Sequence, residues 1–364
     1  MKRIVAATAC WILICQLSSA AAAAESARKE LTPAQTALRD RVRRTLAIQR
    51  QQTFNTLQNT PSDLLSFCLP FGCDTEIRAG GPTGQALNGI TALCWNYSCA
   101  GSEPLMMCDG HIAARVGLNY QQQPAQLLAM LAMSHVGADY PLRVEKNVRT
   151  VADLVEAEQR NCRAGIDQPL RLIGLAFYAP EATWKNGPGE EWSVERMLGQ
   201  ELDRTGRSPT AADLHRPLAL SFTLVRRATN GRPIEGQFLR AKQYLETLDE
   251  HAFASQNGDG SWSLAGFIGR TADADHAIAL RDTGYTLEWL VLSLPAERME
   301  APQILRAVEY LDTLLSSQRF GVNVPWLCSR DIDAVAHATH ALMIYDRRIF
   351  QPADAAKPAE SKAK

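Results

Sequence analysis

The chain lacks the signals of several common protein classes. Its 364 residues carry a formal net charge of -1 at pH 7, and no dense stripe of Lys or Arg is present. Proteins that bind nucleic acid or anionic membranes through charge usually show such a stripe, so neither partner is expected. Strand signals are also scarce. No sustained alternation of apolar and polar residues occurs, and Asn257-Gly258 is followed by Asp-Gly rather than by a strand.

Complete catalytic motifs are absent as well. The sequence has no nucleophile elbow, Walker loop or dinucleotide-binding fingerprint. The glycines of residues 79–89 have no strand–turn–helix context for phosphate binding. His337 and His340 lie three residues apart, but without the neighbouring Glu of a zinc-protease helix. The sequence therefore does not identify a reaction, and we predict no cofactor.

The first residues resemble an export signal. Lys2 and Arg3 precede the apolar run IVAATACWILIC, and the small residues of 20–24 suit signal-peptidase cleavage. We expect residues 1–24 to be removed, because the strongly apolar part is short for a membrane span. The alternative is an uncleaved anchor. The mature chain is expected to be secreted or periplasmic, with no membrane attachment after cleavage.

Export determines how the cysteines are interpreted. Seven remain after the signal: Cys68, Cys73, Cys94, Cys99, Cys108, Cys162 and Cys328. An oxidising compartment favours disulfides, and an odd number leaves at least one thiol unpaired. The pairs Cys68/Cys73 and Cys94/Cys99 are close enough in sequence to close small loops. Zinc is the alternative for one group of soft ligands, although its spacing is not that of a standard zinc finger: Cys94, Cys99, Cys108 and His111.

Helix signals dominate the rest of the chain. Thr32, Pro33 and Gln35 predict a capping box at the start of a long amphipathic helix. Further on, the pattern predicts pairs of helices: 150–160 with 167–178, 192–204 with 212–227, 236–249 with about 274–293, and 301–317 with 331–345. In the later pairs the first helix is the more polar and the second the more apolar. That difference predicts alternating outer and inner helices.

Two of the predicted outer helices are related in sequence. RAKQYLETL at 240–248 and RAVEYLDTL at 306–314 match at six of nine positions, with a spacing of 66 residues. A Gln and then a Trp follow each one: Gln256 and Trp262, then Gln318 and Trp326. Internal similarity of this kind indicates a helical repeat. The tail, residues 351–364, is rich in Pro, Ala and Lys and is predicted to be disordered.

The stretch QNGDGSW, residues 256–262, resembles the QW motif of the terpenoid cyclase and protein prenyltransferase superfamily. In that superfamily the Trp stacks beneath the next helix and the Gln tethers loop backbone, which ties neighbouring outer helices together. The spacing from Tyr244 to Gln256 is longer than in the family, and the second copy, QRFGVNVPW, is degenerate. The alternative is a simple Gly-Asp-Gly turn with a packed Trp.

A second resemblance covers most of residues 60–350. CDGHIAARVGL, QPAQLLAMLAMSHV, RLIGLAFY, EWSVERML and IDAVAHATHALMIYD are similar to an uncharacterised family of secreted toroid proteins from planctomycete bacteria. Together the two resemblances imply an all-α fold, an α/α toroid with about five to seven helix pairs. Residues 25–350 are expected to form it as a single domain.

In such a toroid the starts of the inner helices surround a central cavity. Asp, His and Arg residues gather at the predicted starts: Asp109 and His111; Asp167 and Arg171; Asp213 and His215; His276 and Asp282; Asp331, Asp333 and His337. Asp and His together supply acid–base pairs or metal ligands. The alternative is structural, because Asp is a good N-cap and most histidines near apolar helices are hydrogen-bonded core residues. The predicted catalytic residues are Asp109, His111, His215, Asp333 and His337.

Three functions stay open. The first is an exported enzyme that acts on an extracellular glycan or related polymer through Asp and His residues in the central cavity. The second is a non-catalytic binding or scaffolding protein with a cell-envelope ligand, which the lack of a complete motif favours. The third is a terpenoid cyclase-like enzyme, which the absence of Asp-x-Asp-Asp and Asp-Asp-x-x-Asp disfavours.

Overall fold

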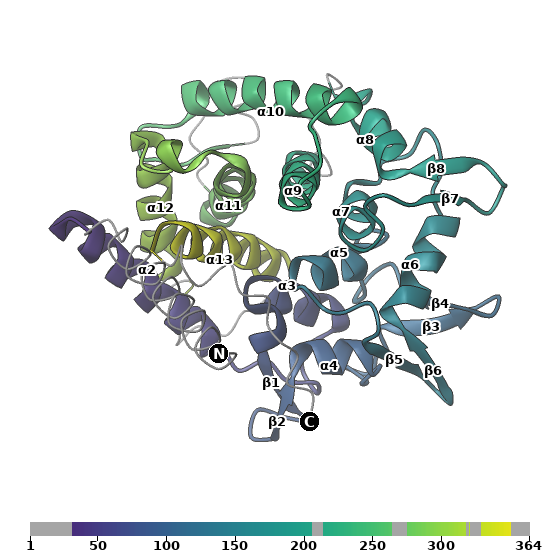
Figure 1. Ribbon diagram of the computed structural model, residues 1–364. Helices are drawn as coiled ribbons and strands as arrows, with labels where there is room; N and C mark the ends of the chain where they lie inside the picture. The colour runs from purple at the N-terminus through teal and green to yellow at the C-terminus, as the bar shows by residue number, and fades with distance from the viewer. Residues whose placement is uncertain (1–30, 206–213, 264–274, 318–319, 321–328, 351–364) are drawn as a thin grey trace, which may run out of the picture. The chain divides into compact units, whose positions relative to one another are not determined.

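The computed structural model describes residues 31–205, 214–263, 275–317, 320 and 329–350 (Figure 1). The predicted signal segment and tail lie outside these residues, as do Asp213, Gln318, Trp326 and Cys328. The chain divides into two units, Met1–Arg41 and Val42–Lys364. The fold is mainly α-helical, with only small pairs of strands.

The elements follow one another along the chain with short connections. The α-helices of the described residues are α2 Pro33–Arg50, α3 Pro61–Phe71, α4 Gly89–Cys94, α5 Gln126–Met133, α6 Val151–Arg160, α7 Pro169–Tyr178, α8 Val194–Leu202, α9 His215–Thr229, α10 Gly236–Ser255, α11 His276–Ser293, α12 Pro302–Leu315 and α13 Ser329–Phe350. The strands are β1 Glu76–Ala79, β2 Gln85–Asn88, β3 Leu105–Cys108, β4 His111–Ala114, β5 Pro141–Val144, β6 Asn147–Thr150, β7 Thr183–Lys185 and β8 Glu191–Ser193.

The predicted helices are present. The backbone N–H of Gln35 donates to Thr32 Oγ1 at 3.2 Å and that of Thr32 donates to Gln35 Oε1 at 2.9 Å, which confirms the capping box at the start of α2. The four predicted pairs correspond to α6 with α7, α8 with α9, α10 with α11, and α12 with α13. Their boundaries agree within a few residues, apart from longer C-terminal ends of α10 and α13.

One set of helices makes a closed cycle of contacts within the second unit. α3 contacts α5, α5 contacts α7, α7 contacts α9, α9 contacts α11, α11 contacts α13, and α13 contacts α3. The intervening helices contact members of this set: α6 and α8 contact α7, α10 contacts α9, and α12 contacts α11 and α13. In Figure 1 the helices α7, α9 and α11 are seen nearly end-on, and α10 is seen lengthwise at the top of the view, above α9 and α11.

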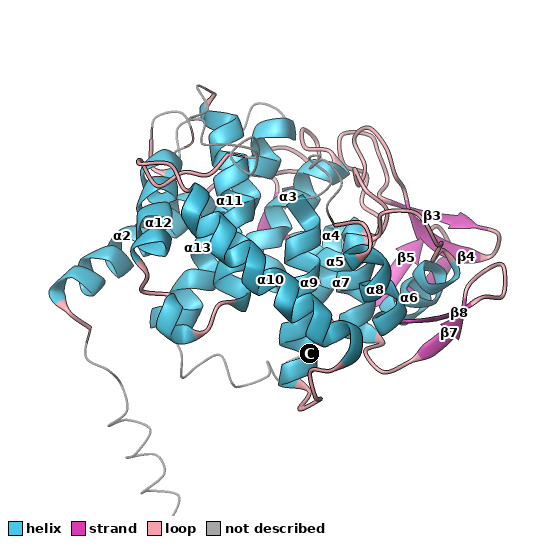
Figure 2. Ribbon diagram, turned by 90° about the horizontal axis from the view of Figure 1, so that it is seen from above, coloured by secondary structure: helices cyan, strands magenta, loops and turns pink. Residues whose placement is uncertain are grey.

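Four antiparallel hairpins were not predicted from the sequence. They pair β1 with β2, β3 with β4, β5 with β6, and β7 with β8 (Figure 2). Each strand has three or four residues, too few for an alternating pattern to stand out. Three hairpins lead straight into a helix, because the last strand residue is also the N-cap: Asn88 for α4, Thr150 for α6 and Ser193 for α8.

Buried ion pairs recur at the same place in consecutive repeats. The eighth residue of α6 is Glu158, which accepts a hydrogen bond of 2.9 Å from Arg171 near the start of α7. The eighth residue of α8 is Glu201, which accepts one of 3.1 Å from Arg216 near the start of α9. Burial is the main influence on Glu201 and raises its pKa despite the Arg216 charge. Each pair joins a helix of the contact cycle to the helix that precedes it in the chain.

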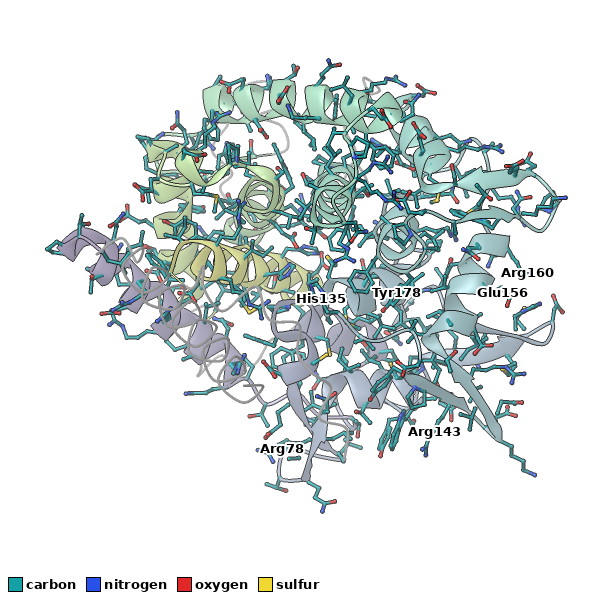
Figure 3. All side chains as sticks on the ribbon, viewed as in Figure 1. Arg78, His135, Arg143, Glu156, Arg160 and Tyr178 are labelled. Atoms are coloured by element: carbon teal, nitrogen blue, oxygen red, sulfur yellow. The ribbon has the colours of Figure 1, made fainter. Side chains whose placement is uncertain are left out.

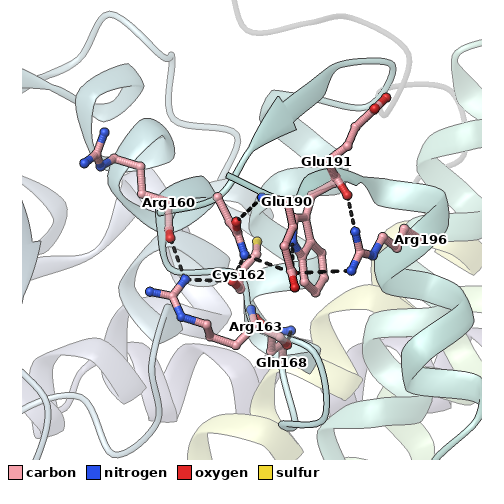
Figure 4. A network of polar contacts seen from close by, with 9 residues as sticks. Arg160, Cys162, Arg163, Gln168, Glu190, Glu191 and Arg196 are labelled. Atoms are coloured by element: carbon pink, nitrogen blue, oxygen red, sulfur yellow. Dashed lines mark hydrogen bonds and ion pairs between the residues drawn. The ribbon is translucent and has the colours of Figure 1, made fainter. Parts of the chain in front are cut away.

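The loop from α6 to α7 is held by further polar contacts (Figure 4). Gln168 Nε2 donates to the Arg163 carbonyl at 2.7 Å, and Asn186 Nδ2 donates to the Cys162 carbonyl at 3.0 Å. Beyond the β7–β8 hairpin, Arg196 of α8 donates to the Glu191 carbonyl of β8, and its guanidinium stacks on Trp192. This network fixes the point where α7 begins.

The QNGDGSW turn joins α10 to both α11 and α12. Gln256 Nε2 donates to the Gly260 carbonyl at 3.0 Å and to the Gln303 carbonyl of α12 at 2.8 Å. Trp262 is 1% exposed, and its indole N–H donates to the Ala252 carbonyl of α10. Its backbone N–H donates to Thr283 of α11 at 3.0 Å. The turn thus ties its own backbone to α12 through Gln256 and to α11 through the backbone of Trp262.

The described cysteines are all free thiols. The small loops predicted for Cys68/Cys73 and Cys94/Cys99 are therefore not closed in this structure. Cys68, Cys94, Cys99 and Cys162 are buried, and burial raises the pKa of the Cys162 thiol to about 11. Buried thiols of this kind are unreactive and pack as small apolar groups.

Replacement of Arg171 by Met tests the repeated ion pair. The variant leaves Glu158 charged and buried without its partner, so we expect the free energy of unfolding to fall by about 3–5 kcal/mol. The double variant Glu158→Met/Arg171→Met should recover most of this loss, because both charges are then removed together. Urea denaturation measures both values. A double variant no more stable than the single one would contradict this interpretation of the pair.

Replacement of Gly260 by Ala tests the contact between the turn and α12. Gly260 has φ +94°, and a Cβ there would lie 2.5 Å from the Arg306 carbonyl oxygen. We expect a loss of about 1–3 kcal/mol in thermal or urea unfolding. Gly258→Ala is the matched control, since a Cβ at Gly258 meets nothing within 4 Å. Equal stability of the two variants would show that the turn does not depend on this close approach.

Candidate functional site

A buried carboxylate on α11 organises a group of polar side chains. Glu288 is fully buried in an otherwise apolar part of the helix. His337 Nδ1 donates to its Oε2 at 2.6 Å, and His340 Nδ1 donates to its Oε1 at 2.5 Å. Both histidines lie on one face of α13, three residues apart. Glu288 therefore fixes the position of α13 against α11 through two charge-assisted hydrogen bonds.

The charges of this group depend on one another. Burial by itself would raise the pKa of Glu288, but the positive charge of His337 and the hydrogen bonds from both histidines lower it to about 2. For His337, burial opposes the charged form, while the charge and hydrogen bond of Glu288 and the charge of Asp333 outweigh it and raise the pKa. An ionised Glu288 can only accept, so Nδ1 carries the proton in both histidines. The other nitrogen of His337, Nε2, points to Asp333 and lies 3.8 Å from its Oδ1.

A second chain of hydrogen bonds meets the first at Asp333. Gln123 Nε2 lies 3.4 Å from His215 Nδ1, and His215 Nε2 lies 3.1 Å from the Tyr285 hydroxyl. The hydroxyl donates to Asp333 Oδ2 at 3.0 Å. Burial and the charge of His337 lower the pKa of His215 to about 4, so it is neutral at pH 7. The Tyr285 ring stacks on His337, with ring centroids 3.8 Å apart.

Three of the side chains described above, His215, Asp333 and His337, line a small cavity. Its volume is about 20 Å³, which is room for about one water molecule. Its walls come from α3, α5, α7, α9 and α13 of the contact cycle, and its polar lining residues are Ser66, Gln126, His215, Asp333 and His337. His340 and Glu288 lie behind the wall. The cavity thus presents an imidazole nitrogen and a carboxylate side by side, the pair needed for proton transfer.

The structure brings together three of the five predicted catalytic residues. His215 begins α9, and Asp333 and His337 lie in the first half of α13. The expectation that Asp109 and His111 begin an inner helix is wrong. Asp109 is exposed and forms, with Gly110, the turn of the β3–β4 hairpin, where φ is 49° and 78°. Two consecutive positive φ values are typical of a tight hairpin turn. Neither Asp109 nor His111 lines the cavity.

Zinc ligands are not grouped in the described structure. Cys94 ends α4 and is buried, whereas Cys108 is exposed and pairs with His111 across the β3–β4 hairpin. Within the described residues, no three or more His, Cys, Asp or Glu side chains have an arrangement that could hold a metal ion. The hairpin holds Cys108 and His111 opposite each other, on an element that includes neither Cys94 nor Cys99.

Tyr285, Glu288 and Gln123 were missed from the sequence. Glu288 stands alone in YTLEWLVL, within a helix that was predicted to be enclosed. A single carboxylate in such a segment needs a buried partner, and that requirement is the signal that could have found it. From the sequence, His340 is only the second member of a pair of histidines with His337. Tyr285 and Gln123 carry no comparable sequence signal.

Comparison of the chain with protein-family models, with curated proteins and with solved structures finds no match. Among the described residues, no helix combines the length and the apolar character that a membrane crossing requires.

The Glu288–His337 pair predicts a pH window for stability. The lowered pKa of Glu288 contributes stability above its ordinary value of 4.5, and this is lost as the pH falls toward about 2. The raised pKa of His337 contributes stability below its ordinary value of 6.5, and this is lost as the pH rises through the folded-state value. Both contributions are complete between these two ordinary values. The measurement is the difference in unfolding free energy between wild type and Glu288→Gln across pH; a flat difference would contradict the pairing.

Proposed function

We propose that the chain is an exported enzyme with an α/α-toroid fold and an acid–base site in its central cavity. The cyclic order of contacts from α3 to α13 supports the toroid, because it gives inner helices around an axis with outer helices behind them. The sequence resemblance to toroid proteins also supports the fold. The predicted export signal supports the proposal that the enzyme is exported. The proposed substrate is an extracellular glycan or related polymer.

The observation that carries the proposal is the orientation of His337. Glu288 holds Nδ1, so that Nε2 is the nitrogen next to Asp333 at the cavity. An imidazole fixed by a buried carboxylate, with one nitrogen free to face a substrate, is the arrangement of a general acid or base. Asp333 is the second proton-transfer group. Its other oxygen accepts from the Tyr285 hydroxyl, which in turn is bonded to Nε2 of neutral His215.

The cavity volume limits how a polymer could use this site. A space of about 20 Å³ takes about one water molecule or one small substituent. The polymer would present one chain end or side group to His337, while the rest of it stays outside. The same small volume favours the second candidate, a non-catalytic binding or scaffolding protein whose polar cluster only holds α9, α11 and α13 together.

Two histidine variants separate these functions. His337→Gln and His340→Gln each remove one hydrogen bond to Glu288, but only His337 lines the cavity. We expect similar losses of thermal stability, while only His337→Gln lowers turnover, by about a hundredfold or more. The assay follows reducing ends and the ultraviolet absorbance of unsaturated ends on a panel of extracellular polysaccharides. Equal turnover by the two variants contradicts the site, and binding without turnover by wild type supports the second candidate.

A further inference from the structure

The C-terminal ends of four helices of the contact cycle carry two arginines, a histidine and a phenylalanine. Arg226 lies in the last turn of α9 and Arg347 in the last turn of α13, and His135 follows the end of α5. Phe177 is the second-last residue of α7. Arg347 and His135 are exposed, and Arg226 and Phe177 are half-buried, so solvent reaches the group.

The ring of Phe177 is the centre of this group. The His135 ring meets it edge-on, with centroids 5.3 Å apart and an interplanar angle of 84°. The guanidinium carbon of Arg226 lies 4.4 Å from the centroid of the same ring. Figure 3 labels His135 and Tyr178, the neighbour of Phe177, next to each other in the view. Burial and the positive charges of Arg226 and Arg347 lower the pKa of His135, so all three residues are within electrostatic reach.

These two arginines differ from their sequence neighbours. Arg227 donates to the Pro233 carbonyl at 2.8 Å and pairs with Glu181, and Arg348 donates to the Val291 and Leu294 carbonyls. Arg226 and Arg347 have no hydrogen bond or salt bridge within the part of the chain that the structure describes, and the Nε of Arg226 is buried without an acceptor. A buried N–H without an acceptor destabilises the fold.

The attraction of helix C-termini for cations does not account for this group. Carbonyl groups at a helix end stabilise a positive side chain there, and Arg348 makes contacts of that kind with the end of α11. For Arg226, however, the buried Nε lacks even a carbonyl, and its charge and that of Arg347 both act on His135, whose pKa they lower. An anion bound by the guanidinium groups would reduce the repulsion between them and would favour the protonated form of His135.

We propose that His135, Arg226 and Arg347 form a binding site for an oxyanion, a sulfate, phosphate or carboxylate group, with Phe177 as the apolar floor of the site. Guanidinium groups bind such anions through paired N–H donors. The anion is free or carried on a polymer. The site is separate from the acid–base cluster, because Arg226 follows His215 by 11 residues on α9, about 17 Å along the helix axis. It does not depend on the proposed enzymatic function.

The test uses sodium sulfate, sodium phosphate and sodium acetate as free anions, and dextran sulfate against neutral dextran as polymers. The full chain is titrated at constant ionic strength, by calorimetry and by NMR of the His135 ring. We expect saturable binding that raises the pKa of His135. Arg226→Gln and Arg347→Gln should each weaken binding about tenfold, the effect of one charge-assisted contact. Arg227→Gln and Arg348→Gln are the matched controls and should bind as wild type does.

The outcomes are distinct. Binding of free anions, or of dextran sulfate alone, supports the site and identifies which source carries the anion. Neutral dextran should not bind. The proposal is overturned if wild type binds no anion saturably, or if the Arg226 and Arg227 variants bind equally. His337→Gln should leave anion binding unchanged, so failure of the acid–base site and failure of this site are separable. Circular dichroism confirms that each variant is folded; if Arg226→Gln is not, Arg347→Gln against Arg348→Gln decides.

Discussion

The charge of Glu288 is the constraint on which the candidate site depends. A carboxylate enclosed by apolar helices is stable only if donors reach both of its oxygens. Two histidines of α13 supply them, so the register of α13 against α11 cannot shift by a turn without leaving the charge unpaired. The same bonds determine which nitrogen of each ring holds the proton. The buried charge of Glu288 therefore fixes both the packing of α13 on α11 and the orientation of the His337 ring at the cavity.

Two consecutive helix pairs show how short helices are held in register against one another. A contact between neighbouring helices through Leu and Ala side chains alone permits sliding, because such contacts are not directional. The buried pairs of Glu158 with Arg171 and of Glu201 with Arg216 are directional, and they occur at equivalent positions. Gln256 does the same for α10 and α12 with backbone carbonyls as partners. Polar groups thus specify the stacking that apolar burial stabilises.

The sequence predicted the helices well and the site in part. Helical periodicity and capping residues are local, so Thr32 and the pairs from α6 to α13 could be located. The hairpins could not be found, because strands of three or four residues leave no periodic signal. Because the β3–β4 hairpin was not predicted, Asp109 and His111 were assigned to the start of a helix instead of to a hairpin. His215, Asp333 and His337 were identified as residue types at helix starts, but their partners Tyr285 and Glu288 come from the middle of another helix, a relation that only three-dimensional packing defines.

Three helices begin at the last residue of a hairpin, so that one side chain ends the strand and caps the helix. The axis of each of these helices is therefore coupled rigidly to its hairpin, with no linker to absorb a change of angle. The tip of the β5–β6 hairpin, Glu145 and Lys146, is exposed, whereas the other two tips are bonded to the rest of the fold: the Gly80 N–H donates to Thr56 Oγ1, and the Gly187 N–H donates to the Arg160 carbonyl. Residues added at the β5–β6 tip would alter the outer surface while the helix bundle kept its geometry, which makes that tip a natural place for variation in length and for grafted sequences.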